Sequence, residues 1–188
     1  MRQHPSGVFK KTLWALVACC IALPPAATAQ SRRDGDEEGE NKPPPELELR
    51  LPGSPKAGNL LAFEPSAAST NRFFIDAESI YIGDDGIVRY TLVVTSASGA
   101  SNTSYEGMRC DTQEQKTYAI GRSDGTWTQV RRSEWRKIVY KEFNRQHGVL
   151  YAAYFCPDGS PVKSAAEAVR RFKYGVPYGE PPRSGSVR

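Results

Sequence analysis

The sequence predicts an α+β fold: a single small domain with a largely antiparallel β-sheet and one or two C-terminal helices. Three observations support this class. Short apolar or alternating segments, separated by glycine-containing turns, dominate residues 59–130 and are typical of antiparallel strands. Apolar residues recur at helical spacing from Trp135 onward. Ser164 and Glu167 form a capping-box pair before the last apolar stretch. Strands followed by a helix, a strand and a helix indicate an α+β domain.

The chain begins with a segment typical of a secretory signal. Basic residues precede an apolar run over residues 13–23, and Ala27-Thr28-Ala29 forms a small-residue cleavage site. The run is shorter than the roughly 20 residues that a membrane span requires. We therefore interpret residues 1–29 as a cleaved signal peptide and expect a periplasmic protein. An alternative is a lipobox ending at Cys19, which would make the protein a membrane-tethered lipoprotein.

Removal of this leader changes the charge of the chain. The 25 basic residues lose Arg2, Lys10 and Lys11, so 22 remain against 21 acidic ones, a net charge of +1. Overall basicity therefore gives no reason to expect a nucleic-acid partner.

Composition divides the rest of the chain into three parts. Residues 30–58 contain an acidic run and Pro43-Pro44-Pro45, which predicts a disordered, Pro-rich acidic linker. Residues 59–174 form the predicted folded domain, long enough for one core. Residues 175–188 are rich in proline and glycine and predict a disordered tail.

Strands are expected first within the folded domain. The segments are 59–63, 72–76, 79–83, 87–95, 103–110, 116–121 and 126–130. Asp84-Asp85-Gly86 and Ser123-Asp124-Gly125 have the composition of hairpin turns. Along residues 87–95 we expect one face in the core and the other partly exposed to solvent.

The pattern then changes twice. Ser133 as N-cap, apolar residues at helical spacing and Gly148 at the end predict a helix over residues 134–147. The continuous apolar run 149–156 predicts a buried strand, and the capping box predicts a closing helix over residues 165–173.

Two cysteines remain after removal of the leader, Cys110 and Cys156. An exported protein folds in an oxidising compartment, and the pair lacks the CxxC spacing of redox sites. We expect a structural disulfide, although a redox-active or metal-binding pair is the alternative.

Catalytic and metal-binding motifs are weak in this sequence. His147 is the one histidine after the leader, and a favourable contact with a helix C-terminus explains it without catalysis. Neither zinc nor calcium spacing is present, so we predict no metal, no cofactor and no catalytic residue. The alternative is a periplasmic enzyme with a carboxylate site around Glu106, Arg109 and Asp111.

One segment is a candidate binding surface. Arg131, Arg132, Arg136 and Lys137 lie within seven residues, and Trp135 would provide the apolar face of their helix. The patch could meet an anionic envelope component, or the protein could contact another envelope protein. A solvated helix start with a buried Trp135 is the alternative explanation.

Several segments resemble the CNP-one-like family, named for cryptic neisserial protein one. They are residues 71–76, 85–93, 98–100 and 104–110, continued by Trp127, Trp135 and Phe155-Cys156-Pro157. The resemblance covers about residues 59–160. It implies an exported proteobacterial domain of uncharacterised function, and it transfers no catalytic residue. We therefore expect a non-catalytic envelope domain that binds or scaffolds another component.

Overall fold

The computed structural model describes residues 45–139 and 145–175. The predicted signal peptide, Cys19, the first part of the predicted linker and residues 176–188 of the predicted tail lie outside the described residues. Within the described ranges no helix is long and apolar enough to cross a membrane.

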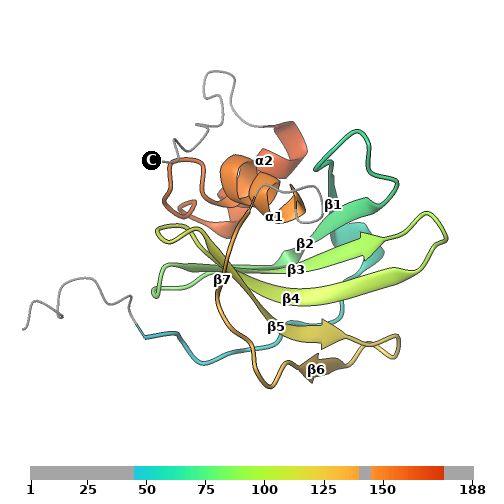
Figure 1. Ribbon diagram of the computed structural model, residues 1–188, viewed down its shortest axis with the longest axis horizontal. Helices are drawn as coiled ribbons and strands as arrows, with labels where there is room; N and C mark the ends of the chain where they lie inside the picture. Colours follow the sequence, from blue (N-terminus) through green and yellow to red (C-terminus); the bar gives the residue numbers. More distant parts are fainter. Residues whose placement is uncertain (1–44, 140–144, 176–188) are drawn as a thin grey trace, which may run out of the picture. The chain divides into compact units, whose positions relative to one another are not determined.

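The domain is built on a seven-stranded antiparallel sheet (Figure 1). Strands β1 to β6 are neighbours in chain order, and β7 pairs with β5. Such a meander follows from the short connections, three of which contain glycine, because they let each strand pair with the one before it. A 3₁₀ turn, η2 (Ala57–Asn59), precedes the first strand. The strands are β1 (Leu60–Phe63), β2 (Arg72–Ile82), β3 (Ile87–Thr95), β4 (Ser101–Arg109), β5 (Glu114–Gly121), β6 (Trp127–Gln129) and β7 (Arg136–Lys137). The predicted fold class is confirmed.

Two predicted strands, 72–76 and 79–83, are one strand in the structure. β2 continues through both segments, with a register shift between Asp76 and Tyr81. At this irregularity the Ser79 hydroxyl donates to the Asp76 carbonyl (2.7 Å) and accepts from the Thr91 amide (2.8 Å). The side chain therefore replaces ladder hydrogen bonds that the irregularity interrupts.

The turn between β2 and β3 holds a buried ion pair. The two oxygens of Asp85 accept from the Arg89 guanidinium at 3.0 and 2.6 Å, and both side chains are at most 3% exposed. A Cβ at Gly83 would clash with the Asp85 carboxylate and the Arg89 guanidinium, so a side chain at this position would have to displace the ion pair. Asp85 also accepts from the Leu47 amide at 2.8 Å. A turn predicted from its composition thus also anchors the segment that precedes the sheet.

The central strand β3 is buried on both faces, which corrects the expectation of one partly exposed face. Arg89 and Thr91 face away from the helices yet are 2% and 0% exposed. The cover on their side comes from residues 45–58, which the sequence analysis assigned to the linker. Leu49 and Leu51 of this segment pack against Tyr105 and Tyr118.

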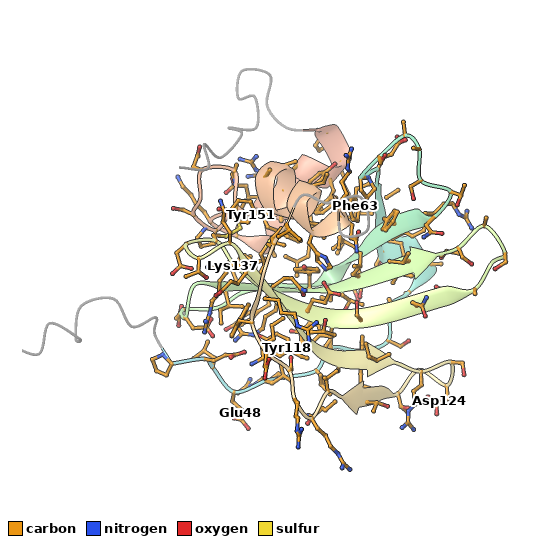
Figure 2. The ribbon with its side chains drawn as sticks, viewed as in Figure 1. Glu48, Phe63, Tyr118, Asp124, Lys137 and Tyr151 are labelled. Carbon is orange, nitrogen blue, oxygen red and sulfur yellow. A yellow bond between two sulfur atoms is a disulfide. The ribbon has the colours of Figure 1, made fainter. Side chains whose placement is uncertain are left out.

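Two hydrogen bonds fasten the same segment to the strands. The Trp127 indole donates to the Pro52 carbonyl at 2.8 Å, and Lys116 pairs with Glu46 at 3.0 Å. The contacts of the domain therefore begin before residue 59. Figure 2 shows Tyr118 on this side of the sheet and Tyr151 on the helix side.

The helical layer contains α1 (Arg145–Val149), the π-helical segment η4 (Leu150–Phe155) and α2 (Ala165–Tyr174). The closing helix is confirmed, and its N-cap Ser164 accepts from the Glu167 amide. This layer packs on one face of the sheet (Figure 1). Tyr90 of β3 stacks on Phe155 at 4.7 Å, and Tyr154 stacks on Phe172 at 4.0 Å.

The predicted strand 149–156 is wrong, and so is the predicted helix 134–147 over residues 134–139. Residues 140–144 lie outside the described part of the chain, and residues 145–147 are helical as part of α1. Arg136 and Lys137 form β7 on the edge of β5, and the Ser133 hydroxyl donates to the Thr117 carbonyl instead of capping a helix. Unpaired backbone groups along that edge outweighed the helical pattern. Residues 150–155 are helical in the structure. The strand prediction failed because a continuous apolar run does not distinguish a buried helix from a buried strand.

A disulfide between Cys110 and Cys156 ties the helical layer to the end of β4. The two Cα atoms are 5.4 Å apart and both residues are 1% exposed. The Tyr151 hydroxyl also donates to the Cys110 carbonyl at 2.9 Å. The pair predicted from cysteine counting is thus a buried structural link.

Replacing both cysteines by alanine is expected to lower the free energy of unfolding by about 4 kcal/mol, because the bond closes a loop with a sequence separation of 46. Urea unfolding of the oxidised protein, the reduced protein and the double variant measures this difference. Reduced protein and variant should have the same midpoint. Two titratable thiols in the denatured, unreduced protein without residues 1–29 would contradict the bond.

Candidate functional site

A buried polar cluster centred on Glu106 lies between the sheet and the helical layer. Glu106 accepts from the Ser104 hydroxyl at 2.6 Å and from the Tyr90 hydroxyl at 3.1 Å, and its Oε2 lies 2.8 Å from His147 Nε2. Glu106 is 4% exposed and His147 is 8% exposed. Glu106 and Tyr90 are opposite each other on β4 and β3, and α1 supplies His147. The cluster therefore joins three elements.

The two ionisable groups shift each other's pKa. Burial alone would raise the pKa of Glu106, but the charge and hydrogen bond of His147, with the Ser104 and Tyr90 hydroxyls, lower it. Burial alone would lower the pKa of His147, but the Glu106 carboxylate raises it. Both shifts favour a charged pair. The pair is nearly excluded from solvent and lies in the core of the domain.

Local sequence patterns do not predict this pair. From the sequence, His147 was expected at a helix end and Glu106 in a carboxylate site with Arg109 and Asp111. The pair is 41 residues apart in the chain, so no local spacing links its members. The available signal was the alternation of β4, which places Glu106 on the same face as the buried Met108 and hence in the core.

Of the proposed carboxylate site, the structure brings Arg109 and Asp111 together and leaves Glu106 apart. Because side chains alternate along β4, Arg109 faces the side opposite Glu106. Arg109 and Asp111 instead line a cavity of about 270 Å³ with Asp84 and Ser160. No histidine or cysteine belongs to the lining of this cavity. Within the described ranges, no three His, Cys, Asp or Glu side chains are grouped so as to hold a metal ion.

A row of cations and aromatic rings occupies the face opposite the helices. The Arg109 guanidinium lies 4.2 Å from the Trp135 ring centre, and the Lys116 ammonium lies 5.6 Å from the same centre. Tyr118 meets Trp135 edge-on at 6.4 Å. Trp135 is half-buried here, which corrects its expected position on the apolar face of a helix. Such contacts hold the segment after β6 against the sheet.

The predicted binding patch is exposed, although not on a helix. Arg131, Arg132 and Arg136 are exposed, and none forms an ion pair with another described residue. Lys137 differs, because its ammonium donates to the Thr112 carbonyl at 2.7 Å and pairs with Glu114 at 3.3 Å. We refer to Arg131, Arg132 and Arg136 as the arginine patch.

The comparisons with known proteins give one match. The model of the CNP1-like family matches residues 39–173, most of the chain. The match starts before the described segment 45–58, in agreement with the contacts of that segment. No curated protein and no solved structure matches the chain significantly.

The Glu106–His147 pair should make stability depend on pH. The pKa of His147 is raised above its ordinary value of 6.5, so the contribution of the pair is complete below pH 6.5 and is lost as pH rises through the folded-state pKa. The pKa of Glu106 is lowered from 4.5, so acid removes the contribution only below that value. Urea unfolding between pH 5 and 9 should show the decline on the alkaline side, and His147→Gln should lack it. Parallel pH profiles for the two proteins would contradict the pairing.

Proposed function

Since the chain belongs to the CNP1-like family, we propose that it is an exported, non-catalytic domain of the cell envelope that binds an anionic envelope component. The observation that carries this proposal is the arginine patch. Three exposed guanidinium groups without described acidic partners have their full hydrogen-bonding capacity available for a ligand.

The backbone holds the arginine patch in place along one edge of the sheet. The Val130 amide donates to the Tyr118 carbonyl at 2.8 Å, and Ile138 donates to the Gln113 carbonyl at 2.8 Å. Residues 130–138 therefore follow the edge of β5. Arg131 also lines a shallow cavity of about 320 Å³, where the other charged residues, Lys116 and Glu46, pair with each other. An anionic polymer or lipid head group is the chemistry that fits this surface.

Two further observations support a non-catalytic, exported protein. The Glu106–His147 pair is buried, and its hydrogen bonds are satisfied inside the core. The Cys110–Cys156 bond supports folding in an oxidising compartment, as the signal-like residues 1–29 suggest.

The binding proposal is tested by replacing all three patch arginines with glutamine. The control replaces Lys163, Arg170 and Lys173, which are exposed around α2 and form no ion pair with a described residue, so the net charge changes equally. We expect the patch variant to lose retention on vesicles containing phosphatidylglycerol and the control to keep it. Each exposed pair contributes about 0–1 kcal/mol, so wild-type retention should also fall with added salt. Equal retention of the two variants would refute the role of the patch.

The export proposal is tested by the intact mass of the protein recovered from the envelope. We expect a chain that starts at Gln30, because the small-residue site ends at Ala29. A diacylglyceryl group on Cys19 would instead show a membrane-tethered lipoprotein, and an N-terminus at Met1 would refute cleavage.

A further inference from the structure

Two exposed apolar side chains lie beside the arginine patch. Leu47, from the segment before the sheet, and Val130, which follows β6, line the same shallow cavity as Arg131. Leu47 is 40% exposed and Val130 is 37% exposed. Singly exposed apolar residues are common on protein surfaces, but these two share one cavity with an arginine. We refer to Leu47 and Val130 as the apolar pair, which makes this surface both cationic and apolar.

The backbone fixes the apolar pair on the domain. The Leu47 amide donates to the Asp85 carboxylate at 2.8 Å, and the Val130 amide donates to the Tyr118 carbonyl at 2.8 Å. Leu49 lines the same cavity and packs against the buried Tyr118. Both members of the apolar pair are therefore held at the surface by contacts within the domain, before any partner binds.

The charge around the apolar pair stays positive after pairing. Lys116 and Glu46, at the cavity, neutralise each other at 3.0 Å. Two exposed carboxylates accompany this surface, Glu48 next to Leu47 and Glu134 between the arginines. The three arginines of the patch outnumber these carboxylates. An anionic partner therefore suits the surface better than a cationic one.

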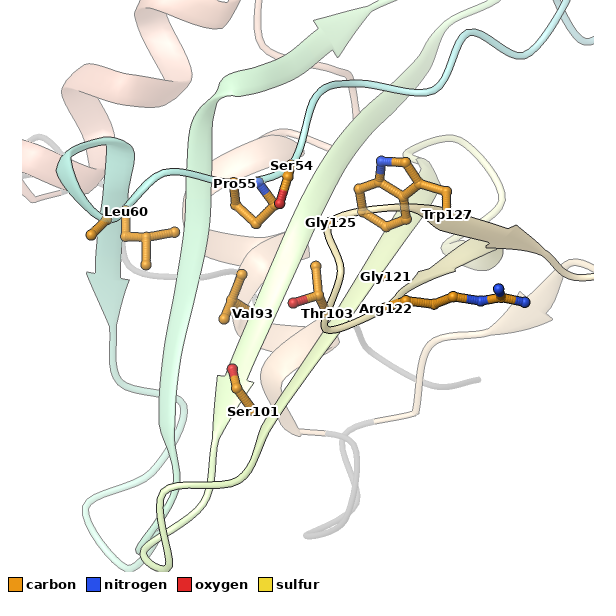
Figure 3. Close-up of a pocket in the computed structure, with 11 residues that line it drawn as sticks. Ser54, Pro55, Leu60, Val93, Ser101, Thr103, Gly121, Arg122, Gly125 and Trp127 are labelled. Atoms are coloured by element: carbon orange, nitrogen blue, oxygen red, sulfur yellow. The ribbon is translucent and has the colours of Figure 1, made fainter.

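A different cavity, of about 310 Å³ beside Trp127, lacks this combination (Figure 3). Its one ionisable lining residue is Arg122. The Arg122 Nε donates to the Thr128 hydroxyl at 2.6 Å, and Figure 3 shows the guanidinium pointing away from the cavity. The surface beside the arginine patch, by contrast, presents its cations and its apolar side chains together.

We propose that this surface docks on the anionic lipid face of a membrane. The arginines would pair with lipid phosphates, and the apolar pair would enter the boundary between head groups and acyl chains. This inference rests on the binding proposed above and names its partner as a lipid surface. An anionic polysaccharide would engage the arginines but would offer no acyl chains to Leu47 and Val130. Salt weakens the contacts of the arginines but not apolar insertion, so part of the binding should resist salt.

The test uses the protein without residues 1–29, whose apolar run would itself bind lipid. The probes are vesicles of phosphatidylglycerol and phosphatidylcholine, and immobilised dextran sulfate, an anionic polymer without acyl chains. The double variant Leu47→Gln, Val130→Thr should bind vesicles about tenfold more weakly, because it loses the partial burial of two apolar side chains. The difference should persist at high salt. Binding to dextran sulfate should be unchanged, because it needs only the arginines.

The matched control is Ile120→Thr, Tyr174→Gln, which also removes two exposed apolar side chains and should bind vesicles like the wild type. Unchanged near-ultraviolet circular dichroism shows that each variant keeps its fold. Wild-type vesicle affinity in Leu47→Gln, Val130→Thr would overturn the insertion and leave the charge-based proposal intact. Wild-type binding to dextran sulfate but not to vesicles would do the same and indicate an anionic polymer. Absence of binding to either probe would refute both proposals.

Discussion

Burial of β3 on both faces is the constraint on which the rest of this domain depends. A sheet with one solvated face needs a single covering layer, whereas this one needs two. Residues 145–175 supply one layer as short helical segments. Residues 45–58 supply the other as an extended segment that crosses the remaining face. The second layer has little regular structure of its own, so its position depends on specific contacts with the sheet.

Each layer contacts a buried ion pair that has one member on a central strand. On the helix side, Glu106 of β4 meets His147 of α1. On the opposite side, Arg89 of β3 meets Asp85, which also accepts from the Leu47 amide. Buried ion pairs add little net stability compared with apolar packing, but losing one partner is costly. We therefore interpret the two pairs as devices that select one arrangement of the covering layers, and the disulfide fastens the helical side further.

The arginine patch lies where these layers leave the sheet uncovered. Residues 130–138 close the edge of β5, and the exposed arginines on that segment also discourage another chain from pairing there. The arginine patch is exposed and separate from the buried Glu106–His147 pair.

Much of the architecture could be predicted from local patterns, and the rest could not. Alternating apolar residues, hairpin turns and the Ser164 capping box act over a few residues, so the sequence alone determined the antiparallel meander and the last helix. Counting cysteines also identified the Cys110–Cys156 bond. The segments around Trp135 and 150–155 have patterns that suit either helix or strand, and only the open edge of β5 and the core surface decided between them. Likewise, only the tertiary structure brought His147 to Glu106 and separated Glu106 from Arg109. Such pairings join residues tens of positions apart. Their energies depend on burial in the folded domain, which local sequence spacing does not indicate.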